Sequence, residues 1–330
     1  MLGDTERLED LTGPLVEVLG RRQEIWLLQW TLLESAFTPT AHGDWSEGAR
    51  RLDEALAISE RIGDCFSRGL ILDARCWLER SRGDYARALR VGRESVDITS
   101  EGSSDVWLGW TAGTLAAAFG DLRAWPEALE LLETALAAAD RIGARAQRFG
   151  ALGRLAWVRL QAGDAPGATA AAERWDAMLD QVRAPDGQAH LYQRQSYTDR
   201  ARVALALGDV ARAEEIVHPI REPLERFGIR EGIAVVHLVL GACAEARGDL
   251  GAAEELLDRG LAATHDEGLP AARLALRMAL ARVSGSPTHA AAARDLGDTM
   301  TESVGDEALA ARFRSAVLAE LGAPAHLAAE

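Results

Sequence analysis

The stretch GDYARA, at Gly83–Ala88, contains a turn pattern that recurs along the chain and indicates the fold. A Gly-Asp pair precedes a third residue in six copies, and Ala124 replaces the Asp in a seventh copy that keeps a tryptophan. We call the third residue of each copy a turn anchor, and the anchors are Thr5, Trp45, Tyr85, Trp125, Ala165, Val210 and Leu250. The anchors recur with a period of roughly 40 residues, and only the step from Ala165 to Val210 is longer. The sequence therefore predicts a tandem array of repeats.

Small residues recur at two fixed distances from the anchors. Three residues after the anchors stand Leu8, Gly48, Ala88, Ala128, Ala168, Ala213 and Ala253. Nine residues before the later anchors stand Ala36, Cys76, Ala116, Ala156, Ala201 and Gly241. Because small side chains let two helices approach closely, these positions indicate repeated helix–helix packing.

Each period is interpreted as two helices. After the anchors, Glu47–Ile62 and Pro126–Ile142 carry apolar residues at three- and four-residue steps, the pattern of an amphipathic helix. The other helix of each pair is expected at segments such as Ser67–Ser81 and Arg145–Gln161. No segment shows sustained alternation of apolar and polar residues, so we expect no strands.

Helix ends are marked as well. Asp44 followed by Glu47 has the spacing of a capping box, and Pro126 suits a first helical turn. The ends of several helices are expected to adopt a left-handed conformation at glycine, namely at Gly63, Gly143, Gly228 and Gly268. A further helix is expected to begin near Val210, and the two prolines that follow, Pro219 and Pro223, are expected to kink or end it.

The turn resembles the tetratricopeptide repeat, which has a standard length of about 34 residues. The longer period is similar to the C-terminal repeat region of MalT-like, LuxR-family bacterial regulators. The resemblance implies an all-α fold: a right-handed α-solenoid of about seven to eight TPR-like helix-turn-helix repeats. We expect the array at residues 1–285, beginning with a half repeat at 1–20, and the last repeat helix with a capping helix at 286–330.

The chain departs from those regulators in two respects. It has no lysine for a nucleotide-binding P-loop, and the expected tail helix at Gly305–Leu321 lacks a basic face for DNA. We therefore expect either a fragment of a longer regulator or a stand-alone relic of one. The half repeat at the front should expose an apolar face unless a partner or a further repeat covers it.

Composition excludes several classes of function. The chain has 330 residues, a net charge of -15, and neither lysine nor asparagine, so a Schiff-base lysine is absent. The acidic excess repels a phosphate backbone, so we expect no nucleic-acid binding by this chain itself. No apolar run reaches the length of a membrane span, so we expect no membrane insertion. Three cysteines without a CxxC pair, and no signal sequence at the start, favour a reducing, cytoplasmic location.

Aromatic residues supply the first candidate site. Two of them, Trp30 and Trp110, lie fifteen residues before an anchor, whereas Phe37, Trp77 and Trp157 lie eight before. In the repeats that this chain resembles, these positions fall on or near the concave surface. The five rings could form an apolar groove for a peptide or a helix. Alternatively, they pack between neighbouring repeats.

The single irregular interval supplies the second candidate site. Gln181–Tyr197 is rich in glutamine and tyrosine and contains a Pro-Asp-Gly turn signal. Polar contacts to a ligand are expected from His190, Tyr192, Arg194, Gln195 and Tyr197. The alternative is a longer loop between repeats without a binding role.

Catalysis has no sequence basis. Neither an HExxH pair nor a GxSxG elbow occurs, so we expect no enzyme, no metal and no cofactor. We expect a protein-interaction scaffold that binds a peptide or helix on its concave face. The alternative is the sensor region of a bacterial transcriptional or signalling regulator, which would bind a small effector or a peptide.

Overall fold

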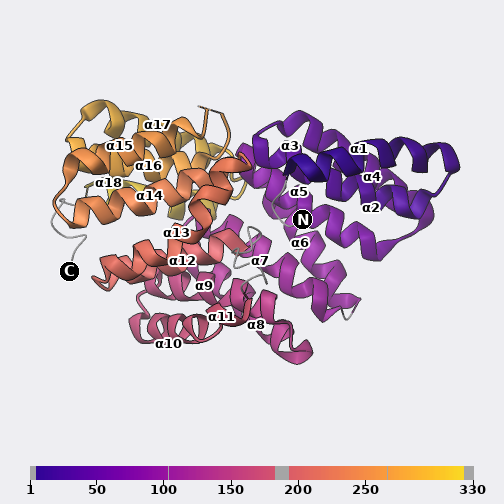
Figure 1. The fold of residues 1–330 in the computed structure, drawn as a ribbon, viewed down its shortest axis with the longest axis horizontal. Helices are drawn as coiled ribbons and strands as arrows, with labels where there is room; N and C mark the ends of the chain where they lie inside the picture. The colour runs from indigo at the N-terminus through magenta and orange to yellow at the C-terminus, as the bar shows by residue number, and fades with distance from the viewer. Residues whose placement is uncertain (1–4, 103, 183–192, 266, 323–330) are drawn as a thin grey trace.

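A computed structural model describes residues 5–102, 104–182, 193–265 and 267–322. Within these ranges the regular structure is helical throughout and no strand occurs, which confirms the all-α prediction (Figure 1). The helices are α1 (Thr5–Arg22), α2 (Ile25–Ser35), α3 (Phe37–His42), α4 (Trp45–Ile62), α5 (Cys65–Arg82), α6 (Tyr85–Glu101), α7 (Asp105–Asp121), α8 (Trp125–Ile142), α9 (Arg145–Gln161), α10 (Ala165–Asp176), α11 (Leu179–Val182), α12 (Arg194–Ala206), α13 (Val210–Arg226), α14 (Arg230–Ala246), α15 (Leu250–Ala262), α16 (Pro270–Ser284), α17 (Pro287–Glu302) and α18 (Glu307–Gly322).

Helix starts are evenly spaced along the chain, from Trp45 to Ala165 and again from Val210 to Pro270. The cause is local, because an aspartate precedes many of these starts and accepts a hydrogen bond from the backbone N–H three residues later. The aspartates that do so are Asp44, Asp64, Asp84, Asp164, Asp209 and Asp249. The four glycines predicted at helix ends all have φ between +62° and +69°, as that prediction required.

The prolines expected to kink or end the helix after Val210 do not end it. The helix α13 continues through both Pro219 and Pro223 to Arg226. Each proline removes a backbone donor, but four apolar side chains hold the helix against its neighbours along this stretch. These fully or nearly fully buried residues are Ile216, Val217, Ile220 and Leu224.

Consecutive helices pack side by side, and a second set of contacts joins every other helix. In this set α5 contacts α7, α7 contacts α9, α9 contacts α12, α12 contacts α14, and α14 contacts α16. We call α2, α3, α5, α7, α9, α12, α14 and α16 the inner helices, because their side chains line the cavities described below.

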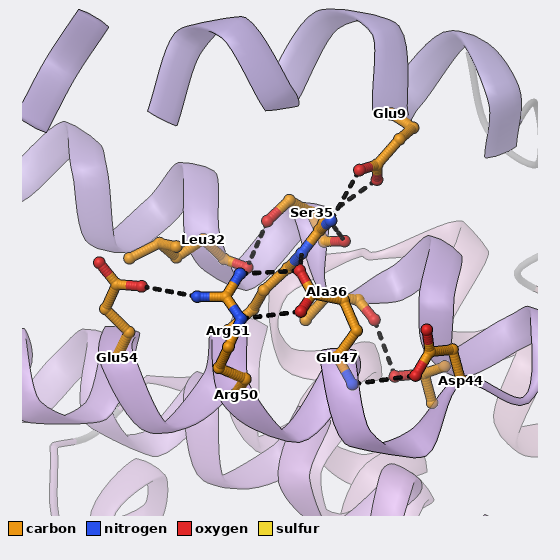
Figure 2. A network of polar contacts seen from close by, with 10 residues as sticks. Glu9, Leu32, Ser35, Ala36, Asp44, Glu47, Arg50, Arg51 and Glu54 are labelled. Atoms are coloured by element: carbon orange, nitrogen blue, oxygen red, sulfur yellow. Dashed lines mark hydrogen bonds and ion pairs between the residues drawn. The ribbon is translucent and has the colours of Figure 1, made fainter. Parts of the chain in front are cut away.

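Figure 2 shows how the first helices are joined to the rest. The capping aspartate Asp44 accepts a hydrogen bond from the backbone N–H of Glu47, as the sequence predicts. The guanidinium of Arg51, on α4, donates to both carboxylate oxygens of Glu9 on α1 and to the carbonyl of Ser35 on α2 (2.7–2.8 Å). One arginine therefore connects three helices.

The last helices of the array contact helices near its start. In Figure 1 the orange and yellow helices α14–α18 lie beside the indigo helices near the start of the chain, above α8–α12. Backbone hydrogen bonds link them: Leu269 donates to the carbonyl of Ser81, and Ala86 donates to the carbonyl of Ser303 (2.5 and 2.7 Å). This closure brings segments that are far apart in the sequence into direct contact.

Two further observations concern the apolar residues of the helices. No helix among the described residues combines the length and the apolar character needed to cross a bilayer. On α1, Leu11 and Leu15 are exposed, so the front of the array carries uncovered apolar side chains. This agrees with the apolar face expected there.

Candidate functional site

The inner helices present one continuous face to the interior of the array. Residues fifteen, eleven and eight positions before an anchor follow an i, i+4, i+7 pattern, so they share one side of a helix. On five successive inner segments these residues are Trp30, Glu34 and Phe37, then Leu70, Ala74 and Trp77, then Trp110, Thr114 and Ala117, then Gly150, Arg154 and Trp157, then Gln195, Asp199 and Arg202. All of them line one or both of two adjoining cavities.

The first cavity, which we call the aromatic cavity, has a volume of about 460 Å³. Its apolar walls are formed by Trp30, Leu33, Phe37, Leu70, Trp77, Trp107, Trp110 and Leu132. Phe37 stacks on Trp77 with ring centroids 4.7 Å apart, and Trp30 lies 6.3 Å from Trp107. The half-buried rings therefore pack between neighbouring helices and line the cavity at the same time.

The second cavity, which we call the polar cavity, has a volume of about 360 Å³. Beside Trp125 and Trp157, it is lined by charged groups, and these are Arg80, Asp121, Arg123, Arg154, Arg194, Asp199, Arg202, Glu231 and Glu320. Glu320 comes from α18 and forms a two-oxygen ion pair with Arg123 (3.0 and 3.1 Å). The C-terminal helix therefore contributes to the wall of this cavity.

A central polar cluster lies where the two cavities meet, and we define it as Arg80, Asp121, Arg194, Gln195 and Glu231. The carboxylate of Glu231 accepts hydrogen bonds from Arg80 (2.6 Å), Arg194 (3.2 Å) and Gln195 (3.0 Å). Arg80 also donates to Asp121 at 2.7 Å. Burial alone would raise the pKa of Glu231, but the guanidinium groups of Arg80 and Arg194 lower it to about 2.

Arg154 extends this cluster into the aromatic cavity. Its guanidinium donates to the carbonyl of Gly113 at 2.6 Å and to the side-chain oxygen of Gln195. It also lies 3.6 Å from the carboxylate of Asp199. Every arginine that lines the aromatic cavity is thus paired with a carboxylate.

The two carboxyl groups that line the aromatic cavity differ from those of the central polar cluster. Glu34 and Asp73 line it, and within the described residues neither forms an ion pair. One oxygen of Asp73, Oδ1, is buried and has no hydrogen-bond partner there. Burial raises the pKa of Asp73 to about 6, although a hydrogen bond with Thr114 opposes the change. Glu34 is the more exposed of the two, and the partial loss of water around its carboxyl group also raises its pKa.

The structure brings most of the predicted aromatic residues together. Trp30, Phe37, Trp77 and Trp110 share the aromatic cavity, whereas Trp157 lines the polar cavity with the guanidinium of Arg202 5.3 Å from its ring centroid. The five rings therefore do not form one groove.

The second set of predicted residues is divided. Arg194 lines both cavities and takes part in the central polar cluster. Tyr197 is 2% exposed and packs against the rings of Phe149 and Trp175, with centroids 5.4 and 5.3 Å away, so it belongs to the core and lines neither cavity. His190 and Tyr192 lie outside the described residues.

Sequence reasoning missed Glu34, Asp73 and Trp107 as cavity residues. Glu34 stands in the column eleven residues before an anchor, which was not identified because its members share no residue type. The helical spacing of this column from the two aromatic columns is the signal that could have found it.

Comparisons with known proteins do not assign a function. No protein-family model matches the chain, and no curated protein matches it either. Among the described residues, no group of three or more His, Cys, Asp or Glu side chains is placed to hold a metal ion.

Proposed function

We propose that this chain is a non-catalytic sensor module: a right-handed α-solenoid of TPR-like repeats that binds a small, largely apolar effector or a short peptide segment in its aromatic cavity. The even spacing of helix starts and the contacts between alternate helices support the solenoid. The aromatic cavity is the observation that carries the binding function.

The size and chemistry of the aromatic cavity favour a small ligand. Its volume of about 460 Å³ lies within the range of small-molecule sites, about 300–1,000 Å³. Such sites combine apolar and aromatic walls with a few polar groups, and this one combines five aromatic rings with carboxyl and amide groups. Arg80, Arg194 and Gln195 of the central polar cluster line the aromatic cavity where it meets the polar cavity, so we favour a small ligand over a long helix.

Calorimetric titration with 4-phenylbutanol, a neutral apolar probe, tests this function. We expect binding to the native chain and at least a tenfold loss of affinity in Trp77→Ala, because Trp77 stacks with Phe37 in the cavity wall. The matched control is Trp157→Ala, which removes a ring of the polar cavity and should change affinity less than twofold. Absence of binding to the native chain, or equal losses in both variants, contradicts the proposal.

A second candidate function is a scaffold for a partner protein, and one surface favours it. An apolar rim is formed by the exposed side chains of Trp26, Leu27, Phe66 and Val106, which are 43–55% exposed. The rim is continuous with the aromatic cavity, since Trp26 contacts Trp30 and Phe66 contacts Trp107. Contiguous apolar surface of this kind is typical of partner binding.

A pull-down from the source cell distinguishes this candidate. A scaffold retains a specific protein with the native chain and loses it with Phe66→Ser, which changes the rim without changing a cavity residue. Identical recovery with both chains, or no specific protein with either, contradicts the scaffold.

A further inference from the structure

We propose that the aromatic cavity selects a small organic cation, an ammonium group on an apolar body, over neutral or anionic ligands of the same shape. This inference rests on the proposed binding function and specifies its ligand class. It follows from which charged groups of the cavity already have partners and which do not.

The positive charges of the cavity are neutralised by the protein itself. Arg80 pairs with Asp121 and Glu231 at 2.7 and 2.6 Å, and Arg194 pairs with Glu231 at 3.2 Å. Arg154 faces Asp199 and donates to the carbonyl of Gly113. An anionic ligand would have to compete with these carboxylates, so the guanidinium groups offer little attraction to it.

The negative charges of the cavity have no such compensation. Glu34 and Asp73 line the aromatic cavity and form no ion pair with any described residue. Oδ1 of Asp73 is shielded from water and lacks a hydrogen-bond donor. A buried carboxylate without a cation is unfavourable, and the partner that would correct this is a positively charged donor. In a chain where the buried carboxylates Glu79 and Glu231 are paired with arginine, the exception is informative.

The positions of these two carboxyl groups place them beside aromatic rings. Glu34 lies four residues after Trp30 and three before Phe37, and Asp73 lies four residues before Trp77. At this spacing the side chains lie on the same side of neighbouring helical turns. An ammonium group near either carboxylate therefore also meets aromatic rings, whose faces attract cations. The apolar body of the ligand would occupy the space between Leu33, Leu70 and the remaining rings.

Three probes with the same phenyl-(CH₂)₄ body test the inference by calorimetric titration at pH 7.5: 4-phenylbutylamine, 4-phenylbutanol and 5-phenylpentanoate. We expect the amine to bind at least tenfold more tightly than the alcohol, and the carboxylate to bind most weakly. Asp73→Asn and Glu34→Gln should each reduce the advantage of the amine by threefold or more without weakening the alcohol. The control Asp97→Asn, at an exposed aspartate of α6 that lines neither cavity, should leave all affinities unchanged.

The outcomes separate this inference from the function on which it rests. If the alcohol binds as tightly as the amine, or if the carboxylate binds best, the selectivity is wrong while the binding function stands. If no probe binds, both are wrong. Circular dichroism verifies the fold of Asp73→Asn, and Glu34→Gln, at a more exposed position, carries the test independently if the other variant does not fold.

Discussion

The aromatic cavity and the polar cavity are each lined by a carboxyl group whose pKa is shifted, and the two shifts have opposite directions. Asp73 has its pKa raised to about 6 by burial, whereas Arg80 and Arg194 outweigh burial and lower the pKa of Glu231 to about 2. Loss of water acts on both groups in the same sense. The sign of the pKa shift is therefore decided by paired cations, because arginines pair with Glu231 and none pairs with Asp73.

This difference indicates different roles for the two cavities. In the polar cavity, the charges of Arg80, Arg194 and Glu231 are paired with one another or with Asp121, as in a structural junction between helices. In the aromatic cavity, two carboxyl groups without an ion pair lie beside half-buried aromatic rings, an arrangement that favours ligand binding.

Neutralising Glu231, which pairs with two buried arginines, should cost more stability than any other change proposed below. Glu231→Gln leaves Arg80 and Arg194 buried without their shared anion, and we expect a loss of about 3–5 kcal/mol in the free energy of unfolding. Urea denaturation at pH 7 measures it. The matched control is Glu245→Gln, whose partly exposed pair with Arg282 should be worth about 1 kcal/mol or less.

The pH dependence of the same group gives a second measurement. Because the pKa of Glu231 is lower in the folded chain than its ordinary value of 4.5, its stabilisation is complete above pH 4.5 and is lost as the pH falls towards 2. The difference in stability between the native chain and Glu231→Gln should therefore shrink over that window. A difference that stays constant with pH, or a loss at pH 7 no larger than that of Glu245→Gln, would show that the polar cavity is not held by this charge.

Residues of α16 and α18 line the polar cavity, so its wall includes the helices that close the array. A pair of glycines can test this closure. Gly268 and Gly63 have nearly equal φ, +64° and +69°, so alanine is strained by a similar amount at both, about 1 kcal/mol. At Gly268 an added Cβ would also lie 2.6 Å from Trp45 and 2.9 Å from the carbonyl of Ser81, whereas at Gly63 it would meet nothing within 4 Å. We expect Gly268→Ala to lose about 2–4 kcal/mol and Gly63→Ala about 1 kcal/mol by urea denaturation. Equal losses would argue against the closure.

The pH dependence of stability that Asp73 causes should have the opposite sign to that of Glu231. A raised pKa means that the unfolded chain ionises first, so stability falls as the pH rises from about 4 to 6 and stays reduced above it. Asp73→Asn removes this penalty and should stabilise the chain by about 3 kcal/mol at pH 7, with almost no gain at pH 3.5. Thermal unfolding at the two pH values measures the difference. A destabilised variant at pH 7 would mean that Asp73 has a compensating partner.

Local features of the fold could be predicted from the sequence because their causes are local. The capping bond of Asp44 and the left-handed glycines depend on a few adjacent residues, and α9 has the bounds that its periodicity predicted. The persistence of α13 through Pro219 was not predicted, because it depends on packing against other helices.

The candidate site could be predicted only in part. The aromatic columns placed Trp30 and Trp77 correctly in one cavity, because helical spacing fixes which residues share a side. The separation of Trp157 into another cavity could not be read from spacing, since it depends on where the central polar cluster divides the interior. Tyr197 was misplaced for the same reason: an irregular segment does not reveal which of its residues turn towards the core.

The hydrogen bonds from Leu269 to Ser81 and from Ala86 to Ser303 have a consequence for how the molecule unfolds. A linear array whose units touch only their neighbours can fray from either end. Here the ends of α16 and α17 are bonded to α5 and α6, so the last helices of the array cannot separate without breaking contacts with helices near its start. We expect these helices to melt together in a single cooperative transition.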